Sequence, residues 1–220
     1  MQMDSSLLVM KNSQLKTKLD LICAPSWKIW ISSSKKRIVK KQISEQGADI
    51  IPELIKLSSG TNSPKLVEEV NSIIKAIGNP AIFYLVETGI NAREFTLIIT
   101  TIYTMLQFSE LPGEVIPYLI LWMSEFSFSK QNLPTTGNDE MDKMILPELN
   151  KLPQESVRWF IANYSEKKEI IMIMAGDALS LVGAKAKYLL PFLKLLFEKN
   201  RHHVAGRITL EKTISKLEYC

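Results

Sequence analysis

Cysteine and histidine are nearly absent from this chain of 220 residues, which has two of each. Cys23 lies near the start and Cys220 is the last residue, so we expect no structural disulfide and a reducing compartment. The adjacent His202 and His203 would have to supply any histidine base. Neighbouring side chains on a helix point about 100° apart, and no cluster with metal-ligand spacing surrounds this pair. We therefore expect neither a metal site nor an enzyme.

Long hydrophobic runs and phosphate-binding motifs are also missing. The longest uncharged run, residues 95–109, includes four Thr and is shorter than the roughly 20 apolar residues of a membrane span. The apolar run 7–10 is too short for a secretory signal. Gly176 and Gly183 belong to no phosphate-loop pattern. We expect a cytoplasmic protein with no cofactor and no membrane partner.

Charge is present with both signs but is distributed unevenly. The net charge is +5 in residues 1–60, −5 in residues 61–169 and +4 in residues 170–220. The densest basic cluster consists of Lys35, Lys36, Arg37, Lys40 and Lys41. On a helix, this cluster could form a face that contacts phosphates or an acidic partner. A run of charges is, however, more often a solvated surface.

A proline-centred phrase recurs along the chain. It reads IIPELIKL from residue 50, VIPYLILW from 115, ILPELNKL from 145 and LLPFLKLL from 189, with a proline-free version, IFYLVETG, from 82. The centres at 52, 83, 117, 147 and 191 are 31, 34, 30 and 44 residues apart. Spacings of this length are typical of two-helix solenoid repeats.

The segments between the phrases have a helical period. In residues 63–78, Ser63 is a good N-cap, Pro64 suits the first helical position and Gly78 ends the helix. Residues 93–108 are rich in β-branched side chains, but three consecutive apolar residues break the alternation of a strand, so we predict a helix. Residues 168–183 are apolar nearly all round and should pack between neighbouring helices.

Two stretches resemble HEAT repeats, particularly those of phycobilisome-lyase-like and related bacterial proteins. They are IIKAIGNPAIFYLVE from residue 73 and DALSLVGAKAKYLLPFLKLL from residue 177. The resemblance covers residues 40–218 and implies an all-α fold, an armadillo-like α-solenoid (right-handed superhelix) of about five HEAT-like antiparallel helix pairs. The matching positions are Ile77–Gly78 and Val182–Gly183 at the Ile-Gly step, and Ala186, Pro191 and Leu193 in the second helix. The Asp that often follows the repeat proline by eight residues is replaced by Gly60, Glu125, Glu155 and Lys199.

We expect residues 1–25 to be an N-terminal segment, partly flexible or half of a capping pair. Residues 26–220 would form a single HEAT-like solenoid domain, opening with a helix from Ser26 to Gly47. An irregular loop is expected near 127–142, where Pro134, Gly137, Asn138 and Asp139 are strong breakers. The chain ends directly after a repeat helix and could be one piece of a longer array.

Stacked helix pairs create a curved surface that suits a protein or peptide partner. We therefore interpret the chain as a non-catalytic protein–protein interaction scaffold or adaptor. Two alternatives follow from the resemblance: a nucleic-acid-binding protein similar to HEAT-like DNA glycosylases, and a phycobilisome-lyase-like chaperone. Asp177 lies in an apolar helix, where a structural hydrogen bond is a commoner role than general base.

The candidate partner-binding residues fall in two places. Arg and Trp are enriched among the residues that dominate protein interfaces, which singles out the adjacent Arg158 and Trp159. The basic cluster adds Lys36, Arg37 and Lys40. Convergence of basic residues on one face would favour nucleic acid, and their scatter would favour a protein partner.

Overall fold

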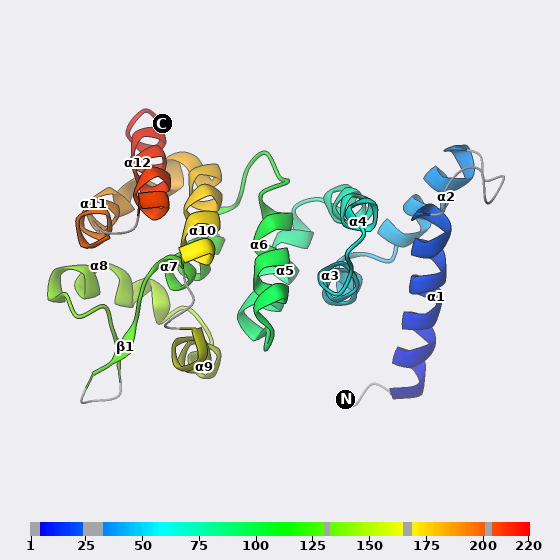
Figure 1. Ribbon diagram of the computed structural model, residues 1–220, viewed down its shortest axis with the longest axis horizontal. Coiled ribbons are helices and arrows are strands. Elements are labelled where there is room, and N and C mark those ends of the chain that lie inside the picture. The colour runs from blue at the N-terminus through cyan, green and yellow to red at the C-terminus, as the bar shows by residue number, and fades with distance from the viewer. Residues whose placement is uncertain (1–4, 24–32, 130–132, 165–168, 201–203) are drawn as a thin grey trace. The chain divides into compact units, whose positions relative to one another are not determined.

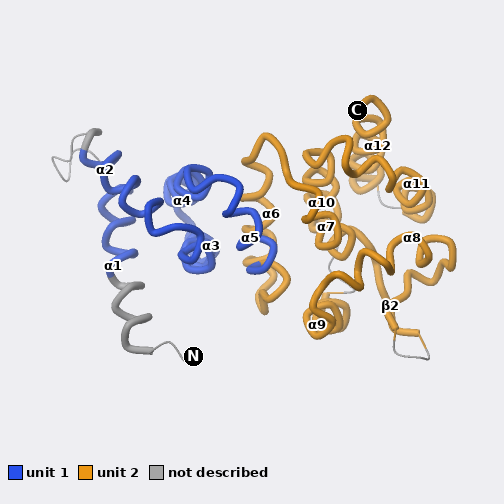
Figure 2. The backbone as a smooth tube through the Cα atoms, turned by 180° about the vertical axis from the view of Figure 1, so that it is seen from behind, with its two compact units in different colours: residues 1–88 blue, residues 89–220 orange. Residues whose placement is uncertain are grey.

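The computed structural model describes residues 5–23, 33–129, 133–164, 169–200 and 204–220 (Figure 1). Within these ranges the regular structure is helical apart from one short hairpin, so the predicted all-α class is confirmed. The chain forms two compact units, Met1–Thr88 and Gly89–Cys220, called unit 1 and unit 2 below (Figure 2). None of the described helices is both long and apolar enough to cross a membrane.

Unit 1 is built from helices that bury aliphatic stripes against one another. Its elements are α1 (Ser5–Cys23), α2 (Ser33–Ser44), the 3-10 helix η1 (Ala48–Ile50), α3 (Ile51–Ser59), α4 (Pro64–Ile77) and the first part of α5 (Pro80–Asn91). α4 contacts α1, α2 and α3, and α1 also contacts α2. The core includes Leu15, Leu19, Ile22, Ile43, Leu54, Ile55, Val70, Ile73 and Ile74.

The prediction for residues 63–78 is confirmed in detail. α4 begins at Pro64, and the Ser63 side chain accepts a hydrogen bond from the backbone N–H of Leu66. Gly78 follows the last helical residue with φ of 82°, a conformation that side-chain-bearing residues rarely adopt. The helix predicted to start at Ser26 corresponds to α2, which is described from Ser33; Ser26 itself lies outside the described residues.

Unit 2 contains the end of α5 and the elements from α6 onward. These are α6 (Phe95–Met105), η2 (Gly113–Val115), α7 (Ile116–Met123), β1 (Ser127–Phe128), β2 (Pro134–Thr135), α8 (Asp139–Leu149), α9 (Gln154–Tyr164), α10 (Glu169–Val182), η3 (Gly183–Leu189), α11 (Leu190–Lys199) and α12 (Val204–Glu218). α10 contacts α6, α7 and α12 (Figure 1), which confirms the prediction that this segment packs between neighbours.

Close helix approaches in unit 2 depend on small residues. A Cβ on Gly176 of α10 would lie 3.1 Å from the methyl group of Thr209 on α12. The Thr213 hydroxyl donates to the Gly176 carbonyl oxygen at 3.1 Å. On α5, a Cβ on Gly89 would lie 2.8 Å from the ring of the fully buried Trp122. The indole therefore fits only because position 89 has no side chain.

The proline phrases adopt one shared local structure in three of four cases. Pro52, Pro117 and Pro191 are each the second residue of an α-helix that directly follows a 3-10 helix. Proline is tolerated in the first helical turn because its missing N–H would have no intrahelical partner there. Pro147 differs because it lies inside α8.

The segment expected to be an irregular loop near 127–142 contains regular structure. β1 and β2 pair antiparallel, with Ser127 opposite Thr135. α8 already begins at Asp139, because the Asn138 side chain accepts hydrogen bonds from two backbone N–H groups of its first turn. Asp142 in that turn accepts hydrogen bonds from the Thr135 and Thr136 hydroxyls.

Candidate binding pocket

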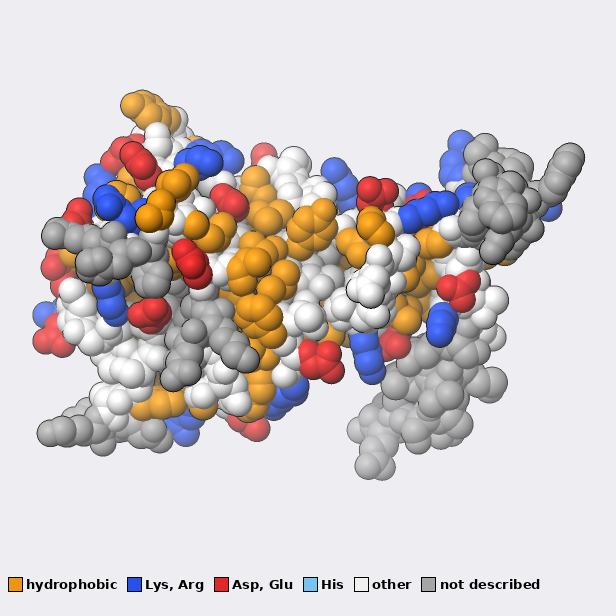
Figure 3. Space-filling view, viewed as in Figure 1, with side chains coloured by type: hydrophobic (Ala, Val, Ile, Leu, Met, Phe, Trp, Pro, Cys, Tyr) orange, Lys and Arg blue, Asp and Glu red, His pale blue; other side chains and the backbone are white. Residues whose placement is uncertain are grey.

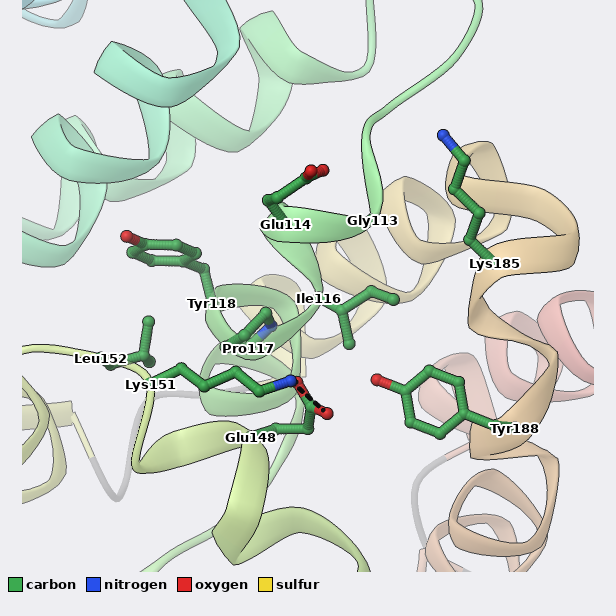
Figure 4. A pocket seen from close by; sticks show the side chains of 10 residues that line it. All are labelled: Gly113, Glu114, Ile116, Pro117, Tyr118, Glu148, Lys151, Leu152, Lys185 and Tyr188. Atoms are coloured by element: carbon green, nitrogen blue, oxygen red, sulfur yellow. Dashed lines mark hydrogen bonds and ion pairs between the residues drawn. The ribbon is translucent and has the colours of Figure 1, made fainter.

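Unit 2 contains a pocket of about 560 Å³ bordered by the start of α7, the end of α8 and η3 (Figure 4). The start of α7 and the end of α8 lie within the proline phrases at residues 115–122 and 145–152. The third border, η3, leads directly into the phrase at residues 189–196. The lining residues are Gly113, Glu114, Ile116, Pro117, Tyr118, Glu148, Lys151, Leu152, Lys185 and Tyr188.

The local structure of the phrases explains how these side chains meet. α7 is buried along most of its length and packs against both α8 and α10. The backbone N–H of Leu111 donates to the Leu181 carbonyl oxygen at 3.0 Å, which ties the segment before η2 to the end of α10. Because η3 continues directly from α10, this bond holds η3 beside the start of α7.

The most buried charge in the pocket belongs to Glu148. This residue is 9% exposed, and the Lys151 Nζ lies 2.8 Å from both of its carboxylate oxygens. The Lys151 side chain is 61% exposed. The ion pair therefore joins a carboxylate held by the protein to an ammonium group that water reaches freely.

Two tyrosines stand on opposite sides of this ion pair. Figure 4 shows the Tyr188 hydroxyl directed toward the Glu148–Lys151 pair, while the Tyr118 ring lies beyond Pro117 on the other side. Burial of the phenol, followed by hydrogen bonding to Glu148 and by its negative charge, raises the pKa of Tyr188 well above its ordinary value. Tyr188 therefore stays neutral and can act as a hydrogen-bond donor over the physiological pH range.

The remaining charges lie at the rim. Glu114 and Lys185 are exposed and form no ion pair with any described residue. The Lys185 ammonium group points away from the Glu148 carboxylate (Figure 4). The interior thus has a fixed negative charge, two phenol rings and an apolar wall of Ile116, Pro117 and Leu152.

The predicted basic cluster lies on α2 in unit 1, and part of its charge is already paired. Lys40 forms an ion pair with Glu69 of α4, and Lys41 lies 3.7 Å from Glu45. Arg37 is exposed, and Lys36 is half-buried. The structure therefore supports a partly neutralised face at this cluster.

Arg158 and Trp159 lie on α9 in unit 2, outside the pocket lining. The Arg93 guanidinium covers the Trp159 ring with its carbon 4.1 Å from the ring centroid. The Tyr164 ring meets Trp159 edge-on, with centroids 5.5 Å apart. Trp159 is therefore already half-buried by its own unit, while Arg158 is exposed.

The other chemical candidates gain no support as sites. Asp177 is exposed on α10, and His202 and His203 lie outside the described residues. Within the described part of the chain, no group of three or more His, Cys, Asp and Glu side chains is placed to hold a metal ion.

A hydrophobic surface in unit 2 is a separate feature. Figure 3 shows hydrophobic side chains gathered over α6 and α10. Exposed hydrophobic residues of these two helices include Tyr103 of α6, which is 45% exposed, and Ile170 of α10, which is 48% exposed. Among the described residues, the buried charged side chain is Glu148, which lies in the pocket, so the pocket is the more specific site.

Sequence reasoning missed Tyr118, Glu148 and Tyr188, although a signal for them was present. Tyr118 and Glu148 each directly follow a phrase proline, and Tyr188 precedes one by three residues. The recurrence marked three helix starts, but it could not show that the start of α7, the end of α8 and η3 enclose one pocket. The chain matches no protein-family model, no curated protein and no solved structure.

Proposed function

We propose that this chain is a non-catalytic interaction module that binds a segment of a partner protein in the unit 2 pocket. The pocket is the observation that carries the proposal. It combines apolar walls and two tyrosines with a small number of fixed polar groups, which is the usual make-up of a specific binding site. Tyrosine is also enriched among residues that dominate binding energy.

The volume of the pocket is suited to individual side chains of a partner protein. A volume of about 560 Å³ lies within the roughly 300–1,000 Å³ of small-ligand pockets. One or two partner side chains could enter it while the flanking backbone runs over the exposed ends of the helices. Glu114 and Lys185 at the rim would then meet polar groups of the same segment.

We further propose that the helix pairs are divergent HEAT-like repeats in a solenoid arrangement. The shared junction of a 3-10 helix with an α-helix carrying proline at its second position supports this assignment, since it recurs at η1–α3, η2–α7 and η3–α11. The nucleic-acid alternative is less favoured because Lys40 and Lys41 are already paired with carboxylates.

Site-specific photocrosslinking with the full chain tests the binding proposal. A photoreactive phenylalanine analogue replaces Tyr188 in one variant and the 88% exposed Tyr219 in a matched control. Both are irradiated in lysate of the source cells, in parallel samples with and without nuclease treatment. We expect discrete protein adducts from position 188 that are absent at position 219.

The proposal is wrong if position 188 gives no protein adduct beyond that of the control. It is equally wrong if the captured material is nucleic acid whose recovery disappears with nuclease or with raised salt, since phosphate contacts weaken steeply as salt increases. In that case attention moves to Arg37 and Arg158.

A further inference from the structure

We propose that the unit 2 pocket selects an arginine side chain of the partner segment, whose guanidinium would replace the Lys151 ammonium on Glu148. This inference rests on the proposed function and assigns the chemistry of its ligand. It follows from the charge, burial and exposure of four pocket residues.

The first step concerns the fixed negative charge. Glu148 is nine-tenths buried, and its carboxylate faces the pocket (Figure 4). A buried carboxylate strongly requires a cation or several hydrogen-bond donors. Lys151 meets this requirement in the free protein, with its Nζ 2.8 Å from both oxygens.

The second step concerns the exchangeability of that cation. Lys151 lies three residues after Glu148, just beyond the end of α8, and its side chain is 61% exposed. The Lys151 ammonium group is readily hydrated when it leaves, so the cost of breaking the pair falls on the Glu148 carboxylate, and an incoming cation that pairs with this carboxylate removes that cost. The position of its ammonium group is therefore open to a better-fitting cation.

The third step identifies the better-fitting cation. A guanidinium can donate two parallel hydrogen bonds to a carboxylate, whereas an ammonium acts as a point charge. Its flat faces also stack on aromatic rings, and Tyr118 and Tyr188 stand on either side of the ion pair (Figure 4). The apolar wall of Ile116, Pro117 and Leu152 suits the methylene stem of the arginine.

The rim charges agree with this choice of ligand. Glu114 is exposed and forms no ion pair with a described residue, so it adds an unneutralised negative charge. Among the described lining residues, the cations are Lys151 and Lys185, and the Lys185 ammonium group points away from Glu148 (Figure 4). An anionic ligand would be repelled by the Glu148 carboxylate, which is fixed in the pocket.

NMR titration of the full-length chain tests the proposal with two defined probes. They are N-acetyl-arginine methylamide and N-acetyl-citrulline methylamide, which have nearly the same shape but differ in charge. At matched ionic strength we expect the arginine probe to shift the amide signals of Glu148, Lys151 and Tyr188. The citrulline probe should bind at least about tenfold more weakly, since hydrogen bonds between charged groups are worth about 1.5–3 kcal/mol.

Three variants separate recognition from folding. Glu148→Gln keeps the side-chain shape and should weaken arginine binding about tenfold or more. Glu155→Gln, an exposed control on α9, should leave it unchanged. Lys151→Ala removes the internal competitor and should strengthen arginine binding severalfold, with a larger arginine-induced rise in melting temperature than in the unaltered chain.

Equal shifts with arginine and citrulline would overturn the inference, as would weaker arginine binding by the Lys151→Ala variant. Neither result would affect the photocrosslinking at position 188. Protein adducts there, combined with no preference for arginine, would leave the binding function intact and reject only the assigned ligand. Loss of both would reject the pocket as a binding site.

Discussion

Unit 1 and unit 2 fill their cores with different side chains. The buried hydrophobic residues described in unit 1 are aliphatic, and its described aromatics are less buried: Phe83 is 47% exposed, and the half-buried Tyr84 donates its hydroxyl to Asp49 at 2.7 Å. Unit 2 buries Trp122, Phe160 and Phe192 completely. Aliphatic side chains can be buried wherever they recur at helical spacing. A large aromatic ring can be buried only where the facing helix has a small residue that leaves room for it.

Close packing positions the helices that border the unit 2 pocket. The bulky Trp122 on α7 is accommodated by Gly89, and α10 approaches α12 through Gly176. These constraints fix α7 and α10 closely, and η2 and η3 extend from their ends. Unit 1 has one 3-10 junction, η1–α3, among its described residues. The following predictions test this comparison, beginning with the largest expected effect.

Replacing Trp122 by Ala should destabilise unit 2 by about 3–5 kcal/mol, because the change leaves a large cavity in a closely packed core. Hydrogen exchange with mass spectrometry should show lost protection in α6, α7 and α10 and retained protection in α3 and α4. The half-buried Trp159, replaced by Ala, is the control and should have a smaller effect. Equal loss of protection in both units would instead support the single domain expected from the sequence.

Replacing Gly89 by Ala should cost about 1–3 kcal/mol, because its Cβ would overlap the Trp122 ring at 2.8 Å. Gly60→Ala in unit 1 is the matched control. Its Cβ would meet only the Lys56 carbonyl oxygen at an ordinary 3.6 Å. Urea unfolding measures both free energies. A stability loss at position 60 as large as that at position 89 would contradict the packing explanation.

The helix caps should differ more modestly between the units. Asn138 accepts hydrogen bonds from the N–H groups of Glu140 at 2.9 Å and Met141 at 3.0 Å. Ser63 accepts one from Leu66 at 3.4 Å. We expect Asn138→Ala to cost about 1 kcal/mol and Ser63→Ala less. Thermal unfolding compares the two variants, and the reverse order would show that these bond geometries do not control the capping energy.

Alkaline pH should weaken unit 2 through the phenols of the buried Tyr164 and the 54% exposed Tyr188. The pKa values of Tyr164 and Tyr188 are raised from 10.0, first by burial and, for Tyr188, also by hydrogen bonding to Glu148 and by its charge. The folded state holds these protons longer than the unfolded state. This contribution is therefore complete below pH 10 and declines as the pH rises above it.

Replacing Tyr188 by Phe removes one of the two hydroxyl groups whose ionisation should lower the free energy of unfolding at high pH. The loss of urea stability between pH 10 and pH 11 should then be smaller than in the unaltered chain, whereas Tyr219→Phe at the exposed end should leave it unchanged. If the Tyr188→Phe variant lost as much stability between these pH values as the unaltered chain, the Tyr188 hydroxyl would not be held by Glu148 in solution.

Much of the local structure could be predicted from the sequence. Ser63, Pro64 and Gly78 determine the bounds of α4, since capping and turn preferences act between residues a few positions apart. The apolar period of α6 outweighed its β-branched content, and the near-uniform apolarity of α10 indicated its central position. Thr104 of α6 is polar and yet buried, and it donates to the Thr100 carbonyl oxygen at 2.9 Å.

The sequence by itself determined the all-α class, several helix bounds and the recurrence of the proline phrases. Only the tertiary structure decided that Tyr118, Glu148 and Tyr188 line one pocket, that Trp122 packs on Gly89, and that Arg93 covers Trp159. A helical period shows which side of a helix is apolar, because that depends on neighbours three or four positions away. It does not show which distant helix will cover that side, because this depends on how the side chains of all the helices fit together.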